Sequence, residues 1–163
     1  MEGEPTAESY TWDFPGEASE LLASVESSAN SVADLADRLR FAPTKSREYH
    51  ISRLMEIRAE INDLGDMLCR LQIIRRAALP WQQEAIDRAL PQLQAMVSDA
   101  ENAILFVNEN PRNLFNPTYR EYASSMYDGS RELSSMVSDF QEYGQAKSDL
   151  SRLEQALELT PVS

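Results

Sequence analysis

Few side chains in this sequence could carry out chemistry at a metal or cofactor, and the lone histidine is the first to consider. Four-helix bundles that bind two iron ions take carboxylates and two Glu-x-x-His motifs from facing helices. Here the residue three positions before His50 is Arg47, and the sequence has no second histidine. It also lacks the Cys-x-x-Cys-His motif of covalent haem attachment. We therefore predict no metal ligand and no cofactor, and we expect His50 to be a structural residue.

Nucleophilic catalysis has equally little support. Cys69, the only cysteine, directly follows Leu68 in a segment with helical periodicity, where a thiol usually acts as a small, inert and buried hydrophobe. The sequence contains no Gly-x-Ser-x-Gly, no phosphate-binding glycine loop and no Gly-x-Gly-x-x-Gly. Glu56 and Glu60 share one helix face, as acidic residues on solvated faces commonly do. We predict no catalytic residue and expect that the protein is not an enzyme.

One short motif could serve recognition. Asn116-Pro117-Thr118-Tyr119 resembles the Asn-Pro-x-Tyr peptide that phosphotyrosine-binding-type adaptors recognise in flexible tails. The resemblance implies an adaptor as partner. A helix start explains the same residues, since Asn is a good cap and Pro suits the first helical position. The helix start is the favoured interpretation.

The element that must position all these residues is a heptad seam. Leucine or isoleucine occupies every a and d position from residue 54 to residue 71, at alternating spacings of three and four. This pattern predicts a long helix, about residues 45–78, packed against other helices along one stripe. Arginines flank the stripe, and we expect them to face acidic residues of the first and fourth helices. The seam residues are Leu54, Ile57, Ile61, Leu64, Leu68 and Leu71.

Three further segments repeat this periodicity, at about residues 17–41, 80–107 and 117–159. The register continues through Pro91, which predicts a kink within one helix. We predict an all-α fold, an antiparallel up-down-up-down four-helix bundle with an extended N-terminal aromatic arm. The arm covers residues 1–16 and the single bundle domain covers residues 17–160.

Charge and composition limit the partners. The chain carries a net charge of −12, and residues 1–37 contain nine acidic and no basic residues. Such a surface repels nucleic acid and anionic lipid, so we expect neither as a partner. No apolar run reaches the length of a membrane span, and no signal peptide is visible at the N-terminus. With a single cysteine, a cytoplasmic location is expected.

Two regions are candidate interaction surfaces. Tyr10, Trp12 and Phe14 alternate with polar residues on one side of the extended arm. The fourth helix, at about 63 Å, is longer than the first, at about 38 Å. Either it bends near a glycine, or one end projects, or the long second helix covers it. These lengths predict a protein-interaction or structural module that binds a protein partner or self-associates, with a homodimer as the simplest form. The candidate leucines are Leu150, Leu153 and Leu157.

The alternative function is binding of a small apolar or aromatic ligand between the helices. The middle of the first helix, residues 27–31, has small side chains that could leave space. Methionine adapts to irregular cavities, and an aromatic ring could close one side. The candidate cavity residues are Met126, Met136 and Tyr143.

Overall fold

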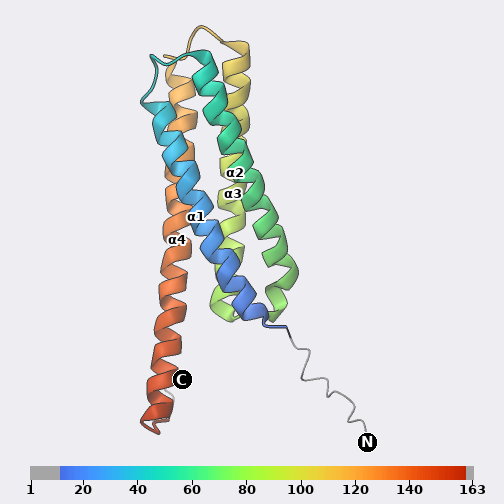
Figure 1. Ribbon diagram of the computed structural model, residues 1–163, viewed down its shortest axis with the longest axis vertical. Coiled ribbons are helices and arrows are strands. Elements are labelled where there is room, and N and C mark those ends of the chain that lie inside the picture. Colours follow the sequence, from blue (N-terminus) through green and yellow to red (C-terminus); the bar gives the residue numbers. More distant parts are fainter. Residues whose placement is uncertain (1–11, 161–163) are drawn as a thin grey trace, which may run out of the picture.

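A computed structural model describes residues 12–160, and within this range the chain forms four long helices and no strand (Figure 1). The all-helical prediction is therefore confirmed. The second helix is followed by a single 3-10 turn, η2, formed by Arg75–Ala77. The helices are α1 (Phe14–Arg40), α2 (Arg47–Ile74), α3 (Pro80–Glu109) and α4 (Pro117–Ala156).

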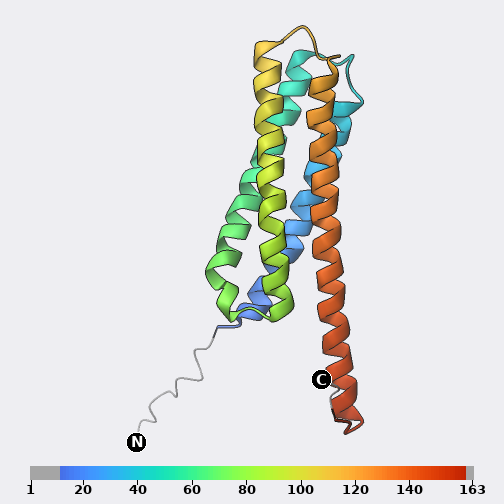
Figure 2. The same ribbon diagram turned by 180° about the vertical axis from the view of Figure 1, so that it is seen from behind.

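The four helices stand side by side in a ring. Each helix packs on the helices before and after it, and α4 closes the ring on α1, which is the most extensive pairing. The links between α1 and α2 and between α3 and α4 lie at one end of the molecule (Figure 1). The short link between α2 and α3 lies at the other end, as the view from behind also shows (Figure 2). Helices α2 and α4 therefore lie diagonally across the ring.

The first helix begins three residues earlier than the sequence predicted. The Asp13 carboxylate accepts a hydrogen bond from the Gly16 amide at 3.0 Å and caps the helix, while Pro15 fits its first turn. Pro15 therefore starts the helix and does not interrupt it. As a consequence, Phe14 belongs to α1 and packs half-buried against the core. The predicted boundary at residue 17 is wrong for this side chain.

The other helix ends are close to the prediction. Ser46 and Asn116 accept amide hydrogen bonds and cap α2 and α4. Helix α2 ends at Ile74 because the chain tightens into η2, so the predicted end at residue 78 is too late. Helix α3 continues to Glu109 and includes Pro91. Helix α4 ends at Ala156, three residues before the predicted end, and the chain turns at Glu158, whose φ is 56°.

The heptad seam of α2 forms one wall of the core. All six of its leucines and isoleucines are buried, and His50 and Ile74 extend the buried stripe at the two ends. Opposite them, α1 contributes mainly small buried residues, which allow the helices to approach closely. These α1 residues are Ala18, Leu22, Val25, Ala29, Val32, Ala33, Ala36 and Leu39.

The basic flanks of α2 and η2 pair with acidic residues of α1 and α3, so only one of the two expected partner helices is confirmed. Arg70 reaches Glu17 of α1 at 2.6 Å, as predicted. Arg75 in η2 pairs with Asp87 of α3 at 2.7 Å. Within residues 12–160 no ion pair joins α2 to α4, because these two helices are diagonal in the ring. The expected contact with the fourth helix is therefore wrong.

No helix within the described part of the chain combines the length and the apolar character that crossing a membrane requires.

Candidate interaction surface

The C-terminal end of α4 projects beyond the other three helices (Figures 1 and 2). Helix α4 has 40 residues and α1 has 27, which correspond to lengths of about 60 Å and about 40 Å. The helix is continuous through both of its glycines. From residue 145 to residue 160 every side chain is exposed except that of Glu154, which is half-buried. We call residues 145–160 the overhang.

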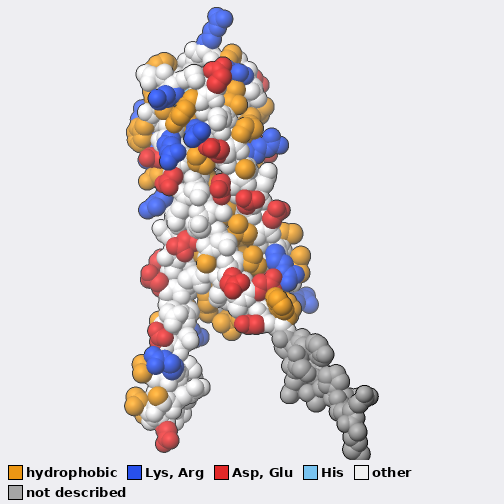
Figure 3. Space-filling model, viewed as in Figure 1, with side chains coloured by type: hydrophobic (Ala, Val, Ile, Leu, Met, Phe, Trp, Pro, Cys, Tyr) orange, Lys and Arg blue, Asp and Glu red, His pale blue; other side chains and the backbone are white. Residues whose placement is uncertain are grey.

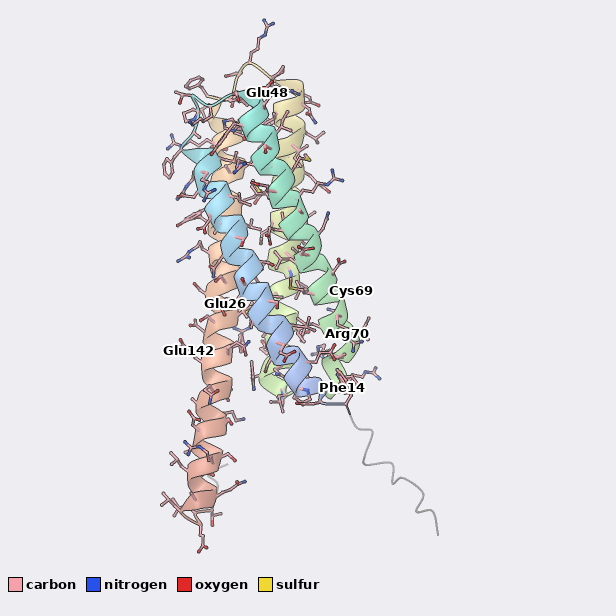
Figure 4. All side chains as sticks on the ribbon, viewed as in Figure 1. Phe14, Glu26, Glu48, Cys69, Arg70 and Glu142 are labelled. Carbon is pink, nitrogen blue, oxygen red and sulfur yellow. The ribbon has the colours of Figure 1, made fainter. Side chains whose placement is uncertain are left out.

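Trp81 marks the point where the bundle ends. This residue lies in the first turn of α3, and its indole ring packs directly on the backbone of Gly144. A Cβ atom at position 144 would overlap the ring. A large aromatic side chain can therefore reach α4 only because a glycine is present there. Glu142, labelled in Figure 4, lies on α4 just before this point.

The overhang carries a second, exposed heptad seam. Leu150, Leu153 and Leu157 are 57%, 48% and 65% exposed, so α2 does not cover them. Tyr143 and Ala146 precede them at the same alternating spacing, and Tyr143 is also exposed. Figure 3 shows hydrophobic side chains gathered near the free end of α4. We call Tyr143, Ala146, Leu150, Leu153 and Leu157 the leucine seam.

The leucine seam faces away from the bundle core. At 3.6 residues per turn, Leu153 lies about 160° around the helix axis from the buried Val137. Simple lengthening of α1, α2 or α3 would therefore not cover the seam. Only a molecule that approaches α4 from its outer side can bury these leucines.

A surface groove between α3 and α4 meets the seam at Tyr143. It has a volume of about 570 Å³, and the Arg88 guanidinium lies 5.3 Å from the centre of the Phe140 ring on one of its walls. The groove is open to the surface and is not a cavity between the helices. Its lining residues are Arg88, Gln92, Glu132, Ser135, Met136, Asp139, Phe140 and Tyr143.

The three residues predicted to line a ligand cavity are not brought together. Met136 and Tyr143 line the groove, whereas Met126 is fully buried and packs in the core. The small residues of α1 also face small residues of α4, since the Ser134 hydroxyl donates to the Asn30 side chain at 2.8 Å. Because α1 and α4 pack closely here, their own side chains fill the region in which a ligand was expected.

The Asn-Pro-x-Tyr motif is part of the fold. Asn116 caps α4, and Tyr119 is 1% exposed. Its hydroxyl lies 2.7 Å from Nδ1 of His50, whose Nε2 lies 2.8 Å from the Ala42 carbonyl oxygen. Burial lowers the pKa of His50, although the hydrogen bond to Ala42 partly opposes this, and burial raises the pKa of Tyr119. An adaptor could not reach Tyr119 in the folded bundle.

Cys69 is exposed, contrary to the expectation that it is buried. It follows Leu68 of the seam, and one residue further along a helix is a rotation of about 100°, which places the thiol on the flank of the stripe. It projects from the outer side of α2 (Figure 4). Among residues 12–160, no three His, Cys, Asp or Glu side chains converge as a metal site would require.

Two aromatic side chains at the end opposite the overhang were not singled out from the sequence. Phe41 follows α1 and is 62% exposed, and Phe115 precedes α4 and is 67% exposed. Arg40 and Arg120 lie over the Phe41 ring at 4.7 Å and 5.6 Å. The sequence signal that could have indicated them is a large apolar residue at the end of a predicted helix, as Phe41 is, or two residues before the start of one, as Phe115 is.

The predicted arm is only partly described. Trp12 is exposed, and its indole N–H donates to Glu17 at 2.7 Å, while Phe14 packs on the core. Tyr10 lies outside the described residues.

Comparison with known proteins does not connect this geometry to a family. No protein-family model, no curated protein and no solved structure matches the chain.

Proposed function

We propose that this chain is a non-catalytic protein-interaction module that self-associates through the leucine seam. One observation carries the proposal: Leu150 and Leu153 within α4 and Leu157 at its C-cap are exposed, on the side turned away from the core. Exposed apolar residues are common singly, but a contiguous stripe of them marks a contact surface. Because the helix is already ordered, binding to it costs little conformational entropy.

The scaffold in this proposal is an up-down-up-down bundle of antiparallel helices, with the N-terminal aromatic arm as a second docking element. Trp12, with 63% of its surface exposed, supports a role for the arm. A protein partner that presents an apolar helix would fit the seam, and a second copy is the simplest such partner. The lone exposed thiol of Cys69 is consistent with the proposed cytoplasmic location.

Sedimentation equilibrium tests this function. The weight-average mass of the intact chain should rise with concentration, and that of a chain ending at Gln145 should not. A full-length variant with Leu150→Gln and Leu153→Gln should behave like the shortened chain. Leu105→Gln is the matched control, since Leu105 is 55% exposed on α3 and lies outside the seam. An intact chain that remains a monomer at every concentration would contradict self-association.

The groove between α3 and α4 favours a second function, the binding of a small aromatic ligand. Met136 and Phe140 supply apolar contacts, and the Arg88 guanidinium could pair with an acidic group on the ligand. The probe 1-anilinonaphthalene-8-sulfonate has this chemistry. Its fluorescence titration should lose its saturable phase in Phe140→Ser and keep it in the variant with Leu150→Gln and Leu153→Gln. Equal binding to both variants would contradict a site in the groove.

A further inference from the structure

We propose that the leucine seam binds the same seam of a second copy in an antiparallel pair, with Leu150 packed on Leu153 of the second copy. This inference rests on the proposed self-association and adds the direction and the register of the contact. The charged residues that flank the seam carry the argument.

Each residue of the leucine seam and its flanks can be assigned a heptad position. Tyr143, Leu150 and Leu157 occupy a positions, and Ala146 and Leu153 occupy d positions. On one flank, the e positions hold Lys147 and Glu154. On the other flank, the g positions hold Glu142, Asp149 and Ala156. Within residues 12–160 neither Lys147 nor Glu154 has an ion-pair partner.

One antiparallel register satisfies both the apolar and the charged positions. An a residue of one helix then packs with a d residue of the other. If Leu150 lies opposite Leu153 of the second copy, Ala146 lies opposite Leu157, and two-fold symmetry repeats each layer. In this register Lys147 of each copy faces Glu154 of the other, so the dimer contains two such pairs of opposite charge. On the other flank, Asp149 at a g position faces the uncharged Ala156.

The alternative arrangements bring like charges together. If the antiparallel register is shifted by seven residues in one direction, Lys147 faces Lys147 of the second copy. A shift by seven residues in the other direction makes Glu154 face Glu154 of the second copy. A parallel pair matches Glu142 with Lys147 but also Asp149 with Glu154, so its attraction and repulsion cancel. Charge complementarity therefore selects the register with Leu150 against Leu153.

The shape of the molecule allows this pairing. The overhang extends beyond the other helices, and the seam lies on its outer side, so two overhangs can meet without contact between the bundles (Figures 1 and 2). An antiparallel pair places the two bundles at opposite ends of the contact. The seam spans about 21 Å from Tyr143 to Leu157, so the buried area is small and the dimer is weak and reversible.

Charge reversal tests the register. The single variants Lys147→Glu and Glu154→Lys each replace two attractions by two repulsions and should weaken self-association about tenfold. The variant carrying both reversals should associate like the original chain. A mixture of the two single variants should form a mixed dimer as tight as the original, because each reversed residue then meets its opposite charge. Sedimentation equilibrium at low salt measures the association constant of the two single variants, of the variant with both reversals and of the mixture.

Two matched controls change the same charges away from the contact. Arg152→Glu alters a c position of the overhang, and Glu158→Lys alters the residue at which the chain turns after α4; neither residue belongs to the seam or to its e and g flanks. They should leave the association constant within about twofold. If Lys147→Glu weakens association no more than Arg152→Glu does, or if the mixture does not recover, the register is wrong and self-association stands. If the intact chain does not associate at all, both proposals are wrong.

Discussion

The Tyr119 hydroxyl and Nδ1 of His50 lie 2.7 Å apart in the core, although the two residues are 69 positions apart in the chain. The Ala42 carbonyl can only accept a hydrogen bond, so Nε2 of His50 carries the ring proton and donates to it at 2.8 Å. Nδ1 is then the acceptor for the tyrosine hydroxyl. Both side chains are buried, and the bond joins the start of α4 to the start of α2.

Removing this hydroxyl should destabilise the bundle. Tyr119→Phe keeps the ring but leaves Nδ1 of His50 buried without a donor, which costs about 1–3 kcal/mol. Urea unfolding monitored by circular dichroism measures the loss in the free energy of unfolding. Tyr143→Phe is the matched control and should have no effect, because Tyr143 is 53% exposed. Equal stability of the two variants would show that the hydroxyl contributes nothing.

Stability should also fall on mild acidification. Burial lowers the pKa of His50 in the folded state, so between that pKa and the ordinary value of about 6.5 the unfolded chain binds more protons. The contribution of neutral His50 to the free energy of unfolding is therefore complete above a pH of about 6.5 and is lost as the pH falls below that value. Urea midpoints between pH 5 and pH 8 should show a steeper acid loss in the original chain than in His50→Gln. Parallel curves would contradict this assignment.

The sequence predicted the place of His50 but not its partner. His50 precedes Leu54 by four residues, which is the spacing of the heptad seam, and in the structure it is buried on the same stripe as Leu54 and Ile57. Periodicity describes the faces of one helix at a time. It carries no information on which residue of another helix lies opposite, so the hydrogen bond from Tyr119 was missed.

The predicted lengths of the helices correctly indicated the overhang, whereas residue composition did not correctly predict a ligand cavity. Counting residues gave the mismatch between α1 and α4, because the rise per residue is fixed. The cavity prediction grouped Met126 with Tyr143 by residue type alone. They lie about 100° apart around α4, so one is buried in the core and the other is exposed. Their angular separation was readable from the sequence.

The seam of α2 should dominate the stability of the core. Leu64 is fully buried at its middle, and Leu64→Ala should cost about 2–5 kcal/mol, as truncations of buried leucines do. Ile73→Ala is the control on the same helix, since Ile73 is 69% exposed and should lose little. Chemical denaturation measures both. A loss below about 0.5 kcal/mol for Leu64→Ala would be incompatible with its burial.

Salt should affect the bundle only slightly. The ion pairs of Arg70 with Glu17 and of Arg75 with Asp87 lie at the surface, where ions screen them. The hydrogen bond from Arg70 lowers the pKa of Glu17, so this pair contributes above the ordinary glutamate pKa and is lost in acid. Glu17→Gln should lower the melting temperature slightly at low salt and not at all at high salt. A large loss that persists in high salt would mean that the pair is shielded from solvent.

Two glycines on different helices, Gly65 and Gly144, should respond in opposite ways to substitution by alanine. Gly65 of α2 has open space where a Cβ would lie, so Gly65→Ala should raise the free energy of unfolding by about 1 kcal/mol through helix propensity. Gly144 of α4 lies beneath the Trp81 ring, which a Cβ would overlap. Gly144→Ala should therefore destabilise the bundle by about 1–3 kcal/mol despite the better propensity of alanine.

A double-mutant cycle then identifies the indole as the cause. Trp81→Leu removes the ring that the new methyl group would meet, so adding Gly144→Ala to that variant should cost much less than adding it to the original chain. Chemical denaturation of the four chains gives the coupling energy between the two positions. If the costs are additive, the ring and the glycine are independent, and the close packing that ends the bundle at Gly144 does not contribute to stability. If they are strongly coupled, packing of the Trp81 ring on Gly144 stabilises the contact between α3 and α4 directly before the overhang.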